Sequence, residues 1–217
     1  MENLKKTQSL KNKFGNNFIG FEELNSISSI LNIPIIKFED VPPIPLPLEE
    51  IENLSDNYIL YLIPPFHLNN NSLSIKSLRD IFGLNPKNAD SVCFYNQDWY
   101  IKESFFLKSN SHYKWNLVEK DVSDTSLGRT NFDLINNLNY KLPSALDLTF
   151  LFFTYYSLFK EILWSYNFIW TSDKDSNNDS IYVGRYFDPN GIAKDGFSIH
   201  RHLSITKVYG GINSLLL

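Results

Sequence analysis

The 217-residue chain is poor in cysteine and in basic charge. Its one cysteine, Cys93, excludes any disulfide within the chain. Lys and Arg number 20 against 24 Asp and Glu, which gives a formal net charge of −4. Nucleic-acid binding needs clustered Lys and Arg to neutralise phosphates, and the sequence has only a mild Lys cluster near its start. We therefore expect no nucleic-acid partner.

The sequence also lacks a long apolar run. Its most apolar stretch, Leu146 to Leu163, is interrupted by Asp147, Lys160 and Glu161, whereas a membrane-spanning helix needs about 20 mostly apolar residues. Residues 1–17 are polar and have no apolar segment typical of a secretory signal. We expect no membrane span, and a location in the cytoplasm or export by a non-standard route.

Motifs that mark common enzyme classes are missing as well. The sequence has no G-x-S-x-G elbow, no Walker loop and no G-x-G-x-x-G. Cys93 lies between Val92 and Phe94, an apolar setting in which cysteine is usually inert and buried. No carboxylate pair stands in an apolar setting that would shift its pKa. The sequence therefore predicts a protein that is not an enzyme and has no cofactor.

Two patterns resemble metal sites without completing them. His200 and His202 would face the same side of a strand, but no third ligand is evident nearby. The run DKDSNND at 173–179 resembles the start of a calcium loop, yet its sixth position is Asn178 rather than Gly and its twelfth is Gly184 rather than Glu. We expect exposed histidines and a solvated turn and assign no metal ligand. Calcium at this loop stays an open alternative.

What the sequence does have is apolar material for a core, with 43% hydrophobic and 15% aromatic residues. Residues 1–17 are expected to form a flexible lead, and residues 18–217 one α+β domain with short strands. Strands are predicted at 58–63, 92–95 and 113–118. Helices are predicted at 75–82, with Gly83 as C-cap, and at 145–163, where Ser144 and Asp147 form a capping box. The second helix is apolar on more than one side, so we expect it to be buried.

Several segments, in order, resemble one family. They are FIGFEELNSISSILNI, YILYLIP, FYNQDWYIKESFF with KWNLVEK, LPSALDLTFLFFTYYSLFKEILW, WTSDKDSNNDSIYVGRYFDPNGI and GGINSLLL. Together they resemble the variable proteins of diversity-generating retroelements, in the branch found in small-genome archaea, candidate-phylum bacteria and their viruses. The resemblance covers most of residues 18–217.

This resemblance implies a C-type lectin fold related to the formylglycine-generating-enzyme group. In that group an LPS-type segment opens a helix and a W-[ST]-S turn precedes the final strands; Leu142-Pro143-Ser144 and Trp170-Thr171-Ser172 occupy those places here. In the family, a reverse transcriptase copies a template repeat with errors at adenines and writes the product into the 3′ end of the gene. The resemblance therefore implies a non-enzymatic ligand-binding protein, with a protein as the expected ligand and a variable region at about 182–209.

Between Ile181 and Ile212 the sequence divides into two sets of residues. Scaffold positions are expected at Val183, Phe187, Gly191, Ile192, Gly211 and Ile212. The expected ligand-binding residues mix charge, aromatic rings and small side chains without strand or helix periodicity, and they are Arg185, Tyr186, Asp188, Ala193, Asp195, Phe197, Ser198, His200, Arg201, His202 and Tyr209. A randomised surface can tolerate exchange only where side chains contribute little to the core. We expect the larger ones to be mostly exposed and to gather on one face.

The sequence also departs from related patterns. Asp188-Pro189-Asn190 only approximates the first triplet of calcium-dependent sugar binding, and a W-N-D triplet is missing. A formylglycine-generating type of enzyme on the same fold is an alternative, but its copper needs two cysteines. A viral or cell-surface attachment protein without diversification is a further alternative. The sequence leaves the oligomeric state open.

Overall fold

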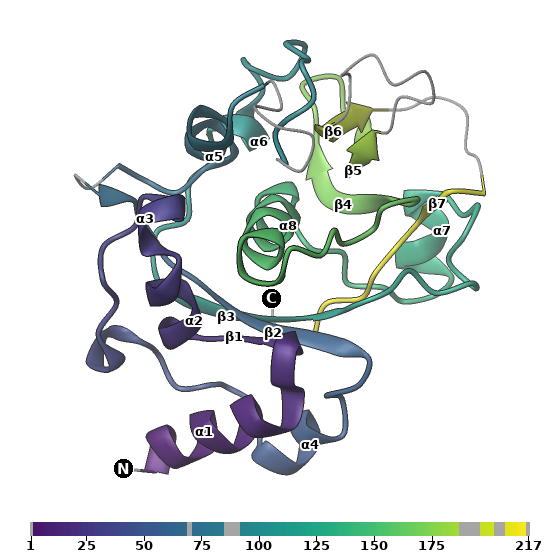
Figure 1. Ribbon diagram of the computed structural model, residues 1–217. Coiled ribbons are helices and arrows are strands. Elements are labelled where there is room, and N and C mark those ends of the chain that lie inside the picture. The colour runs from purple at the N-terminus through teal and green to yellow at the C-terminus, as the bar shows by residue number, and fades with distance from the viewer. Residues whose placement is uncertain (1, 69–70, 85–91, 187–195, 202–206, 216–217) are drawn as a thin grey trace.

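The computed structural model describes residues 2–68, 71–84, 92–186, 196–201 and 207–215. Its strands form two small sheets, and the long helix α8 (Ala145–Phe159) lies between them (Figure 1). The expected α+β class is confirmed. Buried side chains from Leu10 to Ile212 belong to one continuous hydrophobic core, which joins α8 to both sheets.

The first sheet has the order β1-β2-β3, with β1 (Phe18–Ile19), β2 (Tyr58–Ile63) and β3 (Lys114–Glu119). β1 is parallel to β2, and β2 is antiparallel to β3 along its whole length. The predicted strand at 58–63 is confirmed, and the one at 113–118 is shifted by one residue. The end of the described chain returns to this sheet, because Ser214 forms an antiparallel bridge with Val118.

The second sheet has the order β6-β5-β4-β7. Its strands are β4 (Phe168–Lys174), β5 (Ser180–Tyr186), β6 (Gly196–Arg201) and β7 (Tyr209–Gly210). β4, β5 and β6 are antiparallel neighbours, whereas β7 is parallel to β4. The segment 170–172, expected as a turn, instead lies within β4, where the pairing with β5 shifts register between Trp170 and Lys174.

Helix α8 begins where the sequence predicts. Ser144 is its N-cap and accepts a hydrogen bond from Asp147 N at 3.1 Å, while Ser144 N donates to Asp147 Oδ2 at 3.3 Å. This reciprocal pair satisfies two amides that a helix start leaves free. The helix ends at Phe159, four residues earlier than expected, because Lys160 adopts a left-handed backbone with φ of 59°. That conformation interrupts the helical hydrogen bonds.

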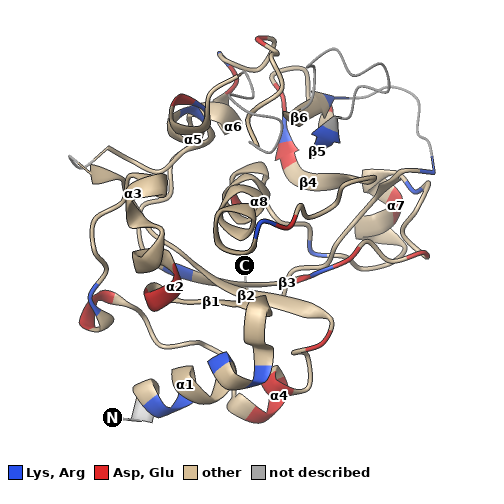
Figure 2. Ribbon diagram, in the orientation of Figure 1, with Lys and Arg blue, Asp and Glu red and all other residues tan. Residues whose placement is uncertain are grey.

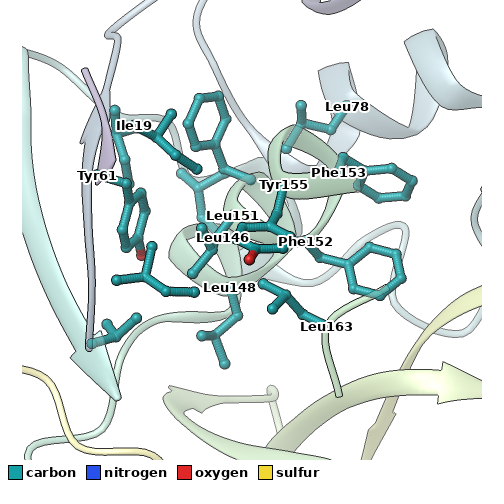
Figure 3. Close-up of a cluster of buried hydrophobic side chains, with 14 of the residues drawn as sticks. Ile19, Tyr61, Leu78, Leu146, Leu148, Leu151, Phe152, Phe153, Tyr155 and Leu163 are labelled. Carbon is teal, nitrogen blue, oxygen red and sulfur yellow. The ribbon is translucent and has the colours of Figure 1, made fainter. Parts of the chain in front are cut away.

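The core is built around α8, whose residues 145–155 are all buried. Its side chains reach in opposite directions (Figure 3). On one side, Tyr61 of β2 donates a hydrogen bond from its hydroxyl to Asp147 O at 3.3 Å. On the other side, the rings of Phe152 and Phe153 lie 4.7 and 5.6 Å from that of Phe197 in β6. Because α8 packs against both sheets, the helix has no polar face.

The N-terminal segment is not the flexible lead that we expected. Residues Glu2–Phe14 form helix α1, in which Leu10 and Phe14 are buried. These two residues are four apart and so share one face of the helix. Lys11 Nζ lies 2.6 and 2.7 Å from carboxylate oxygens of Glu22 and Glu23. Figure 2 shows lysines of α1 in the neighbourhood of acidic residues of α2 and α4.

The remaining helices are short. They are η1 (Gly15–Asn17), α2 (Phe21–Ser26), α3 (Ser28–Leu31), η2 (Phe38–Asp40), α4 (Leu48–Glu52), α5 (Ile75–Phe82), α6 (Ser104–Leu107) and α7 (Asn131–Asn136). The prediction of α5 with Gly83 as C-cap is confirmed. The predicted strand at 92–95 is reduced to a single bridge between Phe94 and Phe197. Over the described residues, no helix is both long and apolar enough to cross a membrane.

Candidate functional site

The two faces of the second sheet differ in what they contact. Side chains alternate between the faces along each strand. On the inner face, Ile169, Val183 and Ile199 are buried in the core that surrounds α8. On the outer face, rings from all four strands lie together, and we call them the outer aromatic cluster: Phe168, Trp170, Tyr182, His200 and Tyr209. Three of its members come from the region expected to vary.

Tyr182 is the centre of the outer aromatic cluster. Its ring stacks on the His200 imidazole, with centroids 5.5 Å apart and planes 24° apart. It also lies 4.7 Å from the ring of Tyr209 and 5.1 Å from that of Trp170. The hydroxyls of Tyr182 and Tyr209 are 3.4 Å apart. Offset and edge-on contacts of this kind add roughly 0.5–1.5 kcal/mol per pair beyond burial.

Two titratable groups of the cluster, His200 and Tyr182, are uncharged at neutral pH. Burial lowers the pKa of His200 to about 4, because a cation is poorly solvated there. Burial also raises the pKa of Tyr182 far above its usual value, and the hydrogen bond with Tyr209 acts in the same direction. Tyr182 and Trp170 are themselves buried, so only the half-buried rings of Phe168, His200 and Tyr209 can meet a ligand.

The free edge of β6 is covered by the segment that follows Cys93. Tyr95 N donates to Phe197 O at 2.9 Å, and Phe197 N donates to Cys93 O at 2.8 Å. Further along, the indole of Trp99 donates to Ile199 O at 3.0 Å. Gln97 Nε2 lies 3.4 Å from His200 Nδ1. This cover holds β6, and with it His200, in a fixed place on the sheet.

The structure divides the predicted binding residues instead of gathering them on one exposed face. Phe197 is fully buried on the inner face, so the expectation that it is exposed is wrong. Ser198 is also buried, and its hydroxyl donates to Gly184 O at 3.1 Å. Alternation explains Phe197, which shares the inner face with Ile199 and packs on α8. Ser198 lies on the outer face with His200 and is buried there.

His200 and Tyr209 belong to the outer aromatic cluster, but both are only partly exposed. The expectation of an exposed histidine at 200 is therefore corrected to a half-buried one. Arg185 is half-buried in β5. Tyr186 is described only as the last residue of β5.

Some of the expected residues lie outside the described part of the chain. They are the binding residues Asp188, Ala193, Asp195 and His202 and the scaffold positions Phe187, Gly191 and Ile192. The scaffold positions Val183, Gly211 and Ile212 are buried, as expected.

Arg201 holds the acidic loop that was expected to be a solvated turn. Its Nη1 donates to Asp175 Oδ2 at 2.6 Å, and its guanidinium carbon lies 4.7 Å from the ring centre of Trp99. Asp175 Oδ1 accepts hydrogen bonds from the amides of Asn177 and Asp179 at 2.9 and 2.8 Å. The Asp175 side chain is fully buried, so this turn is only partly solvated. Both of its oxygens have protein donors.

Burial by itself would raise the pKa of Asp175, but the hydrogen bonds from Arg201 and from the Asp179 and Asn177 amides outweigh it and lower the pKa. Ser176 joins the loop to the start of α6, since its amide and hydroxyl both donate to the Glu103 carboxylate, at 2.8 and 3.0 Å. Arg201 and the loop are thus parts of the scaffold.

Metal-ligating residues do not converge within the part of the chain that the structure describes. No group of three or more His, Cys, Asp or Glu side chains there is placed to hold an ion. Cys93 is buried beside the core. Sequence reasoning missed Phe168, Trp170 and Tyr182 as members of the candidate site. The available signal was strand alternation: Phe168 and Trp170 are two residues apart, and Tyr182 directly precedes the buried Val183.

Comparisons of the chain with protein-family models, with curated protein sequences and with solved structures found no match.

Proposed function

We propose that the chain has a C-type-lectin-like fold and is a non-enzymatic ligand-binding protein whose C-terminal surface is diversified by a retroelement. The ordered resemblance of its segments to retroelement variable proteins is the origin of this proposal. Two structural features are compatible with it. Ser144, the last residue of the LPS-type segment, opens α8, and the chain returns to its first sheet where Ser214 bridges Val118.

The observation that carries the proposal is the division of β5 and β6 into two faces. Inner residues such as Val183 and Ile199 belong to the main core. Tyr182 lies in a separate small cluster with Leu134, Leu142 and Trp170, against which Tyr209 packs. A surface that changes repeatedly must not carry the stability of the domain. Side chains at the rim of the second cluster can change at a smaller cost than those of the main core.

A protein is the ligand that this face suits best. Tyrosine and histidine rings give rigid contact area at low entropic cost, and aromatic residues are enriched at binding hot spots. Val208, whose carbonyl accepts a hydrogen bond from Phe168 N, is 41% exposed, and Tyr166, two residues before β4 in the chain, is 84% exposed. An uncharged aromatic face with an apolar margin is typical of protein contacts.

The DNA beside the gene tests the proposal. Diversification requires a near-copy of the 3′ end of the gene that differs mainly at adenines, next to a gene for a reverse transcriptase. We expect both within the same locus. If the locus has neither, the protein is a binding protein of fixed sequence, such as an attachment protein, and the diversification part of the proposal fails.

A further inference from the structure

A groove of about 310 Å³ opens at the start of α8, outside the region expected to vary. It is bounded by α6 and the residues after it, by the start of β3, by the first turn of α8 and by β4. Phe105 and Leu146 give it apolar walls, and four charged side chains line it: Lys108, Lys114, Asp147 and Asp173. Its volume falls at the lower end of the range of small-molecule sites, roughly 300–1,000 Å³.

Two of the four charges form a pair with each other. Lys114 Nζ lies 2.7 Å from Asp147 Oδ1, and the Asp147 side chain is only 2% exposed. The other oxygen, Asp147 Oδ2, accepts a hydrogen bond from Ser144 N at 3.3 Å. Both oxygens of this buried carboxylate therefore have partners within the protein, and Lys114 neutralises its charge.

The other two charges have no ion partner among the described residues. Asp173 Oδ2 accepts a hydrogen bond from Ala145 N at 2.7 Å, which leaves its Oδ1 for the groove. Lys108 is exposed. Burial raises the pKa of Asp173 and the nearby Asp147 adds to this, although the Ala145 amide, Lys108 and Lys114 act in the opposite direction. A cation brought to Asp173 would stabilise its ionised form.

The same arrangement disfavours a ligand that is only an anion. The start of a helix attracts negative charge. At the start of α8, two carboxylates of the protein already accept hydrogen bonds from the free amides: Asp147 from Ser144 N, and Asp173 from Ala145 N. A ligand must instead offer a donor or a cation to the carboxylate of Asp173, and an acceptor to the ammonium group of Lys108.

We propose that this groove binds a small zwitterion of the amino-acid type, with its ammonium group at the carboxylate of Asp173 and its carboxylate at Lys108. The apolar part of the ligand then lies against Phe105 and Leu146. All of these residues precede position 182, so the site would stay constant while the outer face of the second sheet changes. The site does not depend on the proposed function.

Binding of free L-amino acids to the full chain tests this site. The amino acids are first screened by their effect on thermal unfolding, and those that stabilise are measured by titration calorimetry. We expect at least one to bind with a Kd below about 1 mM, and its N-acetyl and amide derivatives, each lacking one charge, to bind at least about tenfold more weakly. Failure of every amino acid to bind overturns the proposal, as does equal binding of the derivatives or of glucose.

Variants locate the site. Lys108→Gln and Asp173→Asn should each weaken binding at least about tenfold. Asn at 173 keeps an oxygen that can accept from Ala145 N, so the start of α8 should be preserved. Lys102→Gln, an exposed lysine that does not line the groove, is the matched control and should bind as the parent does. If Asp173→Asn does not fold, Lys108→Gln alone decides, because its side chain is exposed. Unchanged binding in Lys108→Gln contradicts the assignment.

Discussion

Arg201 Nη1 donates a hydrogen bond to Asp175 Oδ2 at 2.6 Å, so the last described residue of β6 holds the loop between β4 and β5. Both residues were singled out from the sequence for other reasons, Asp175 as part of an incomplete calcium loop and Arg201 as a surface residue. The structure joins them in one ion pair in which Asp175 is fully buried and Arg201 is about one-third exposed.

Replacing Arg201 by Ala should therefore destabilise the fold. The change leaves the Asp175 carboxylate buried with its two amide donors alone, and we expect a loss of about 1–3 kcal/mol in the free energy of unfolding. Urea denaturation measures this. Lys102→Ala, which removes an exposed cation, is the control and should change stability by less than about 0.5 kcal/mol. An Arg201→Ala variant as stable as this control would mean that the arginine is a surface residue after all.

Helix α1 should contribute to stability through its buried face. Leu10 is fully buried and Leu4, on the same helix, is 48% exposed. We expect Leu10→Ala to cost about 2–5 kcal/mol and Leu4→Ala to stay within about 0.5 kcal/mol. Thermal unfolding of the two variants, side by side, checks this. Equal unfolding midpoints for the two variants would mean that α1 contributes no packing to the fold, as expected for a flexible N-terminal segment.

The two faces of the second sheet should respond differently to truncation. Phe197→Ala removes a ring that packs on Phe152 and Phe153, so we expect a loss of about 3–5 kcal/mol. Tyr209→Ala removes a half-buried ring of the outer aromatic cluster and should cost distinctly less. Chemical denaturation of both variants gives the comparison. A loss for Tyr209→Ala as large as that for Phe197→Ala would show that the outer face is part of the core.

His200 should make the protein sensitive to mild acid. Its folded pKa of about 4 lies below its ordinary value of 6.5, so the unfolded chain binds the proton more readily. The stability that His200 contributes is complete above pH 6.5 and is lost as the pH falls toward 4, by up to about 3 kcal/mol.

Measuring the free energy of unfolding between pH 7 and pH 4 checks the role of His200. His200→Gln should flatten the profile relative to the parent, while His112→Gln, at an exposed histidine, should leave its shape unchanged. Parallel profiles for the parent and His200→Gln would contradict the burial of His200.

The sequence was most informative where one local rule decides the structure. The capping box at Ser144 and Asp147 predicted the start of α8, and the β-prone run at 58–63 predicted β2. The end of α8 could not be predicted, because the left-handed backbone of Lys160 is not favoured by lysine itself.

The candidate site was harder to predict because its burial depends on distant segments. Phe197 is covered by α8 and by the bridge to Phe94, more than 40 residues away in both cases. Phe197 and Ile199 are apolar and two residues apart, which is the alternation of a strand with one buried face. The residues expected to bind a ligand show no such periodicity as a whole, so the alternation at 197 and 199 was not recognised. The outer aromatic cluster likewise combines β4 with β7, which are neighbours only in the folded sheet.

Variation among natural copies of the gene tests whether the outer face of the C-terminal strands is the diversified surface. The 3′ ends of many copies from one natural population would be sequenced and compared with the template repeat. Diversification predicts substitutions at template adenines that change codons such as 200 and 209, while codons 183, 197 and 199 keep apolar residues. Identical 3′ ends in all copies, or equal variation at the inner codons, would contradict the claim.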